Sequence, residues 1–182
     1  MALFVSGCGG SEDQQASAPS KGAEESAQGP TFKAADVGFT FKYPEGFQQV
    51  DEPNDGEVLA SVTPAPGDVN NGLKIRSTSE QELPFSSYAS QLRTQFETQL
   101  ATKINQREEK RGGVDLGVLE WSKPYTKTDL GEKKTIRLHS MSYFFAGGGK
   151  TWQLECLSSQ DHRSDIDEAC QQASGSIEFT ER

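Results

Sequence analysis

Hydrophobic and polar residues alternate in three short runs in the first half of the chain. Residues 39–43 read Phe-Thr-Phe-Lys-Tyr, a period of two that is typical of a strand with one buried face. A second alternating run covers residues 58–62, and a third begins at residues 73–75 after the tight-turn sequence Asn70-Asn71-Gly72. The pattern therefore predicts three strands before the middle of the chain.

The period then changes to that of a helix. Six apolar residues spaced three or four apart predict a helix with one apolar stripe, which we expect to face a sheet: Phe85, Tyr88, Ala89, Leu92, Phe96 and Leu100. A second, shorter helix is predicted near the end of the chain. Ser164 with Asp167 resembles a capping box that would start it, and Gly175 is a natural stop.

Three further segments predict strands. Residues 114–121 are apolar on both faces, which favours a central position in a sheet. Residues 136–145 and 151–157 form a predicted hairpin around three consecutive glycines. The alternation in its first arm changes phase near Ser140, which indicates either a bulge or a sheet covered on both faces. A last short strand is expected at residues 177–179.

This order predicts an α+β domain, an antiparallel sheet with helices packed on it. The stretch Phe39-x-Phe41-x-Tyr43-Pro44-Glu45-Gly46-Phe47, followed by a hairpin, a long helix, long strands and a last helix, resembles the Mog1/PsbP-like fold. That group includes a photosystem extrinsic subunit and small bacterial lipoproteins such as the LpqN-like ones. The resemblance covers about residues 36–180 and implies an α/β/α sandwich that serves as a binding or assembly factor rather than an enzyme.

The first residues resemble an attachment signal. Val5-Ser6-Gly7-Cys8 resembles a bacterial lipobox, in which the cysteine sulfur receives a diacylglyceryl group. No Lys or Arg precedes it and the apolar stretch is short, so we expect residues 1–8 to be a truncated signal peptide. The alternative is a free cysteine in an unstructured end. Residues 9–36 are polar and predict a disordered tether, which leaves residues 37–182 as a single domain.

Composition limits the partners. The net charge of −9 and a sequence pI near 4.8 disfavour binding to nucleic acid or to anionic lipid surfaces. Two histidines and three cysteines do not make a zinc cluster of the usual kind, so we expect no metal and no cofactor. The predicted location is the bacterial cell membrane, with the domain on the extracytoplasmic side and held through the lipid on Cys8.

Two cysteines remain if Cys8 is acylated. Cys156 shares a strand face with Trp152 and Leu154, and Cys170 lies on the apolar stripe of the last predicted helix. Both side chains are expected between that helix and the sheet, which predicts a Cys156–Cys170 disulfide. The alternative is a pair of buried free thiols.

We therefore expect a non-catalytic binding or assembly module for a protein or envelope component. Its partner surface is predicted at a loop after a strand end, with Trp121 and Tyr125 as aromatic contacts; the alternative is that both residues close the edge of the core. The first functional alternative is a hydrolase that uses an acidic patch, and the second is a passive structural lipoprotein. The patch consists of Glu45, Asp51, Glu52, Asp55 and Glu57.

Overall fold

A computed structural model describes residues 29–33, 37–50, 59–65, 68, 70–129 and 131–180. Within these residues two antiparallel sheets are present. The larger sheet has the order β3-β4-β5-β9-β8-β7-β6, with β3 (Gln48–Val50), β4 (Ala60–Thr63), β5 (Gly72–Ser79), β6 (Asn105–Arg111), β7 (Val114–Asp129), β8 (Glu132–Gly147) and β9 (Lys150–Ser159). The smaller sheet has the order β1-β2-β10, with β1 (Thr31–Phe32), β2 (Phe39–Lys42) and β10 (Glu178–Phe179).

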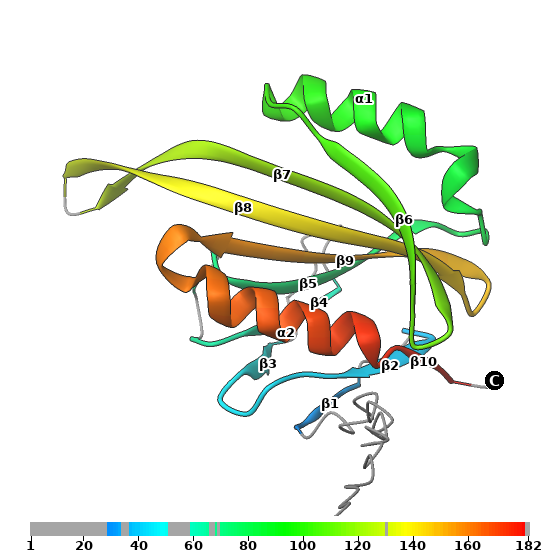
Figure 1. The fold of residues 1–182 in the computed structure, drawn as a ribbon. Helices are drawn as coiled ribbons and strands as arrows, with labels where there is room; N and C mark the ends of the chain where they lie inside the picture. The colour runs from blue at the N-terminus through cyan, green and yellow to red at the C-terminus, as the bar shows by residue number, and fades with distance from the viewer. Residues whose placement is uncertain are drawn as a thin grey trace, which may run out of the picture.

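Two α-helices cover the larger sheet from opposite sides (Figure 1). Helix α1 (Ala89–Leu100) follows a short 3-10 turn, η1 (Phe85–Ser87), and α2 (Arg163–Gly175) follows a second one, η2 (Gln160–His162). The smaller sheet lies on the same side as α2. The predicted α+β class, antiparallel strands with helices packed on them, is confirmed.

Each face of the larger sheet has its own hydrophobic core. One core joins the sheet to α2 and to the smaller sheet, and includes Phe39, Phe41, Tyr143, Phe145 and Ile166. The other joins the opposite face to the α1 side, and its buried members are Phe85, Ala89, Ile104, Leu119, Trp121, Leu138 and Phe144. Phe144 and Phe145 thus point to different cores, as neighbours on a strand must.

The phase change in β8 is explained by these two cores. β8 pairs with β7 and with β9 in continuous register, so the strand has no bulge there. Leu138 faces the α1 core, whereas Tyr143 and Phe145 face the α2 core. Of the two interpretations left open by the sequence, the sheet covered on both faces is the one the structure has.

Three local predictions are wrong. Residues 29–33, inside the predicted tether of residues 9–36, belong to the folded domain: β1 pairs with β2, and Phe32 is fully buried and stacks on Phe41. Helix α2 begins at Arg163 and has no side-chain cap, so the predicted capping box at Ser164 is not formed. The segment from Trp121 to Tyr125 is not a loop, because β7 continues through it to Asp129.

Three strands were not predicted: β1, β3 and β6. β6 has the sequence Asn-Gln-Arg-Glu-Glu-Lys-Arg and forms an edge of the larger sheet. No helix in the described part of the chain is long and apolar enough to cross a membrane.

Candidate functional site

An open cleft lies at one end of the larger sheet and has a volume of about 1130 Å³. We call it the sheet-end cleft. Five segments that are distant in sequence line it: residues 82–86, 108–109, 112–117, 144–146 and 177–179. They meet where β7 begins and β8 ends, beside the turn from β6 to β7.

Glycines shape this cleft. Gly112 and Gly113 both have positive φ angles, 53° and 86°, and form the two-residue turn between β6 and β7. Gly117 lies under the ring of Phe85, and a Cβ atom at this position would clash with that ring. Its missing side chain therefore lets Phe85 lie flat against β7, stacked on Phe144 with ring centroids 5.8 Å apart.

The cleft combines this aromatic floor with carboxylates. Of its five acidic residues, two are neutralised: Glu109 pairs with Arg111 at 2.6 Å and with Arg107 at 3.1 Å, and Asp115 pairs with Lys110 at 3.4 Å.

The other three are Glu82, Glu108 and Glu178, which have no ion-pair partner among the described residues. Glu82 accepts a hydrogen bond from the backbone N–H of Gly149 at 2.8 Å. None of the lining residues is Lys or Arg, so the cleft presents negative charge above an apolar floor.

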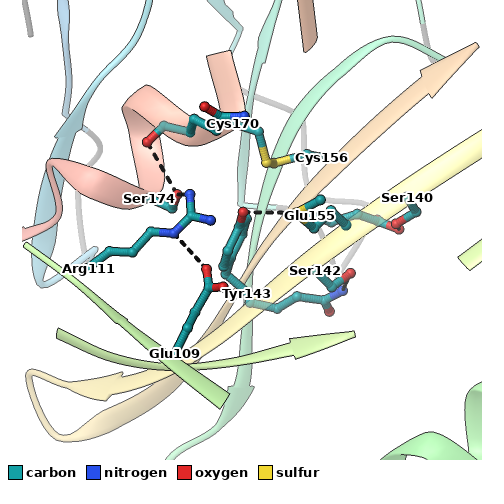
Figure 2. Close-up of a disulfide and its surroundings, with 12 residues drawn as sticks. Glu109, Arg111, Ser140, Ser142, Tyr143, Glu155, Cys156, Cys170 and Ser174 are labelled. Carbon is teal, nitrogen blue, oxygen red and sulfur yellow. Dashed lines mark hydrogen bonds and ion pairs between the residues drawn. A yellow bond between two sulfur atoms is a disulfide. The ribbon is translucent and has the colours of Figure 1, made fainter. Parts of the chain in front are cut away.

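The predicted disulfide lies in the core on the α2 side. Cys156 of β9 and Cys170 of α2 are joined, with their Cα atoms 6.0 Å apart, and both residues are buried. Figure 2 shows the pair beside Tyr143 and Arg111. The bridge links α2 to a central strand of the larger sheet, so its role is structural.

Arg111 connects the disulfide region to the rim of the cleft. Its guanidinium lies 5.3 Å from the ring centre of Tyr143, donates a hydrogen bond to Ser174 Oγ at 3.0 Å and pairs with Glu109 (Figure 2). Burial raises the pKa of the Tyr143 hydroxyl, which donates a hydrogen bond to Met141 Sδ. This cluster holds the end of β6 against α2 and thereby fixes one wall of the cleft.

A polar network crosses the opposite face of the larger sheet. Glu155 is almost fully buried, pairs with Arg76 at 2.9 Å and accepts a hydrogen bond from Ser140 at 3.2 Å. Beside it, Gln153 donates to Ser142 Oγ at 3.0 Å. Each of these acceptors has a hydrogen-bond or ion-pair partner in the sheet, as buried polar groups with a structural role do.

The two predicted partner contacts separate in the structure. Trp121 is 7% exposed and belongs to the core on the α1 side, so it is a core residue, as its alternative interpretation held. Tyr125 lies four residues further along β7, is 41% exposed and is paired with Ile136 of β8. Tyr125 therefore remains a candidate contact, but on a strand and not on a loop.

Other predicted residues lie outside the described part of the chain. These are Cys8 and four residues of the acidic patch, Asp51, Glu52, Asp55 and Glu57. Glu45, the remaining patch residue, is described and exposed. Among the described residues, no group of three or more His, Cys, Asp or Glu side chains could hold a metal ion.

No protein-family model and no curated protein sequence matches the chain. Several solved structures, however, match the chain in fold. Cyanobacterial PsbP (CyanoP) from Synechocystis sp. PCC 6803 superimposes with a TM-score of 0.54 at 12% identity, over 87% of this chain and 96% of that one. The chain is similar in fold to CyanoP. The predicted Mog1/PsbP-like architecture is thereby confirmed, while an identity this low shows the fold alone.

Two further structures are similar. A protein from Bacteroides thetaiotaomicron VPI-5482 gives a TM-score of 0.53 at 13% identity; the match covers 85% of this chain, which spans about half (50%) of that longer one. LpqN of Mycobacterium tuberculosis, described as involved in cell envelope biogenesis, gives a TM-score of 0.48 at 12% identity over 85% of this chain and 91% of that one.

Sequence reasoning missed the sheet-end cleft. Its residues come from five separate segments, and no local pattern connects them. One signal was available: Gly112-Gly113 between a charged run and an apolar run predicts a hairpin, which would have placed Glu108 and Glu109 beside the start of β7.

Proposed function

We propose that the protein is a non-catalytic binding or assembly module on the extracytoplasmic side of a bacterial membrane. The observation that carries this proposal is the sheet-end cleft, with its phenylalanine floor and three carboxylates that have no ion-pair partner among the described residues. Concave sites that combine an apolar floor with a few polar groups are where proteins most often bind ligands. The partner is a protein or an envelope component.

The disulfide supports the proposed extracytoplasmic location. Bridges of this kind persist in oxidising compartments and are rare in the cytosol. The attachment rests on the resemblance of Val5-Ser6-Gly7-Cys8 to a lipobox. A diacylglyceryl group supplies two chains, and two chains give stable attachment where a single one gives only marginal binding.

The test of the cleft uses charge reversal in the lipidated chain, expressed behind a bacterial lipoprotein signal peptide in its native host. The variant Glu108→Lys with Glu178→Lys should lose the protein or envelope component that crosslinks to the wild type in native membranes. The matched control is Glu168→Lys, an exposed acid on α2 outside the cleft, which should keep it. Equal crosslinking by the cleft variant and the control would contradict the proposal.

The test of the anchor is separate. Wild type should partition into the detergent phase and carry a diacylglyceryl adduct on Cys8 by mass spectrometry, whereas Cys8→Ser should remain in the aqueous phase. An unmodified Cys8 in protein recovered from membranes would remove the anchor from the proposal and leave the cleft intact.

A further inference from the structure

The far part of the β7–β8 ribbon stands apart from the rest of the larger sheet (Figure 1). β7 and β8 pair continuously as far as Asp129 and Glu132. β6, however, pairs with β7 only as far as Glu120, and β9 pairs with β8 only from Leu138. Beyond these points the ribbon has two strands, and we call residues 122–128 and 132–137 the basic arm.

The basic arm has a positive net charge, whereas the chain as a whole has a negative one. Between residues 122 and 137 the sequence has five basic residues against two acidic ones, in a chain whose net charge is −9. The basic residues are Lys123, Lys127, Lys133, Lys134 and Arg137, and none has an ion-pair partner in the described structure.

Two of these lysines face each other. Lys127 lies directly opposite Lys134 across the ribbon, next to the pair formed by Tyr125 and Ile136 on the same face. Like charges directly opposite each other destabilise a strand pair, and a two-stranded ribbon is only marginally stable by itself. The stability of the ribbon therefore does not account for this arrangement, whereas contact with an anionic surface does.

The complementary surface lies at the other end of the same sheet. The cleft is lined by the start of β7 and the end of β8, and the arm is formed by the end of β7 and the start of β8. Within the described part of the chain, Glu82, Glu108 and Glu178 of the cleft have no ion-pair partner, and no Lys or Arg lines the cleft. Its phenylalanine floor matches the Tyr125 and Ile136 pair of the arm.

We infer that the basic arm of one copy docks into the sheet-end cleft of a second copy. The arm places Lys127 and Lys134 against the carboxylates of the partner's cleft, and Tyr125 with Ile136 against its aromatic floor. Because the two surfaces differ and lie at opposite ends, the contact is head-to-tail and extends into chains or closes into rings. The inference rests on the proposed function, since it assigns an occupant to the same cleft.

A membrane surface fits the arm less well. Tyr125, Lys127 and Lys134 lie on the α1 face of the ribbon, as the alternation from Trp121 requires. The N-terminal part of the domain, β1, packs on the opposite face through Phe32. The face that carries Lys127 and Lys134 thus points away from the side on which β1, the first described strand, packs.

The experiment uses the full chain with Cys8→Ser, so that lipid does not drive association. Light scattering after size exclusion, at a series of concentrations, should show a mass above that of the monomer that grows with concentration. The apparent dissociation constant should rise at least about tenfold between low and high salt, because exposed charges are screened.

Two variants then test the two sides of the contact separately. An arm variant, Lys127→Glu with Lys134→Glu, and a cleft variant, Glu108→Lys with Glu178→Lys, should each be monomeric alone. Mixed in equal amounts they should form a 1:1 dimer, because the intact arm of the cleft variant meets the intact cleft of the arm variant. The control Lys33→Glu with Glu168→Lys, which changes exposed charges elsewhere, should associate like the wild type.

Several outcomes overturn the inference. A chain that stays monomeric at every concentration, or folded variants that form no dimer on mixing, excludes self-docking. Arm-dependent binding of a monomeric chain to phosphatidylglycerol vesicles would assign the arm to a membrane instead. A monomeric chain whose cleft variant still loses the crosslinked partner in native membranes excludes self-docking and leaves the proposed function standing.

Discussion

Removal of the disulfide is the perturbation whose effect the structure specifies most directly. Cys156 and Cys170 are 14 residues apart in sequence and join β9 to α2. In the chain-entropy description, closing a loop of this length lowers the free energy of the folded state relative to the unfolded state by about 3 kcal/mol. Replacing both residues by Ala also removes two buried sulfur atoms from a packed core, at about 1 kcal/mol for each small void.

We therefore expect Cys156→Ala with Cys170→Ala to reduce the free energy of unfolding by about 3–5 kcal/mol. For a domain of this size that corresponds to a fall in Tm of about 6–20 °C. The assay is urea unfolding followed by tryptophan fluorescence, with and without a reducing agent. Wild type in reductant lacks the bridge but keeps the sulfur atoms, so its difference from the double variant measures the packing contribution alone.

Two results would contradict this expected loss of stability. Free thiols at both positions in non-reducing peptide maps of secreted protein would show that the bridge does not form. A double variant as stable as the oxidised wild type would show that the bridge does not constrain the unfolded chain, because both entropy and packing predict a loss.

Two further predictions concern aromatic side chains. Trp121→Ala should lower the free energy of unfolding by about 3–5 kcal/mol, because the indole is buried in the α1 core. Tyr125→Ala should leave the free energy of urea unfolding within about 0.5 kcal/mol of wild type. Equal losses in the two variants would contradict the assignment of Tyr125 to the surface. Burial raises the pKa of Tyr88 from 10.0 to about 12, so its contribution to stability is complete below about pH 10 and is lost as the pH rises toward 12. Stability measured from pH 8 to 11 should therefore fall less steeply in Tyr88→Phe, and identical slopes would exclude this cause.

The parts of the fold that were predictable are those with a buried face. β2 and β8 alternate because one or both of their faces enter a core, and the cysteines paired as expected because each lies on an inward-facing stripe. β6 has no such signal. All seven of its residues are polar, as is common for an exposed edge strand that must avoid pairing with other chains, so a hydrophobic pattern cannot reveal it.

The partner surface was misplaced for a related reason. Pro124 after Trp121 indicated the end of a strand, yet β7 tolerates proline here because its outer edge has no neighbour beyond Glu120. Whether a strand has a free edge depends on which strands pair, and that is a property of the whole sheet. The sheet-end cleft depends on the same information, since it exists only once β6, β10 and residues 82–86 are brought to one end of β7.

Substitution of Gly117 tests whether this glycine makes room for the aromatic floor of the cleft. A Cβ atom at this position would clash with the ring of Phe85, which stacks on Phe144 and meets Tyr88 edge-on with ring centroids 5.6 Å apart. Gly117→Ala must therefore displace that ring, and overpacking of this kind costs about 1–3 kcal/mol. The loss of chain entropy in the unfolded state offsets about 0.4–1 kcal/mol of it.

The matched control is Gly175→Ala at the end of α2, where a Cβ atom meets nothing within 4 Å. That variant should be neutral or stabilised by up to about 1 kcal/mol. The decisive variant combines Gly117→Ala with Phe85→Ala: once the ring is gone, the added methyl group has nothing to displace, so the double variant should lose less stability than the two single variants together. Strict additivity in urea unfolding would show that the glycine and the ring are independent, which contradicts a cleft floor in which Gly117 makes room for Phe85.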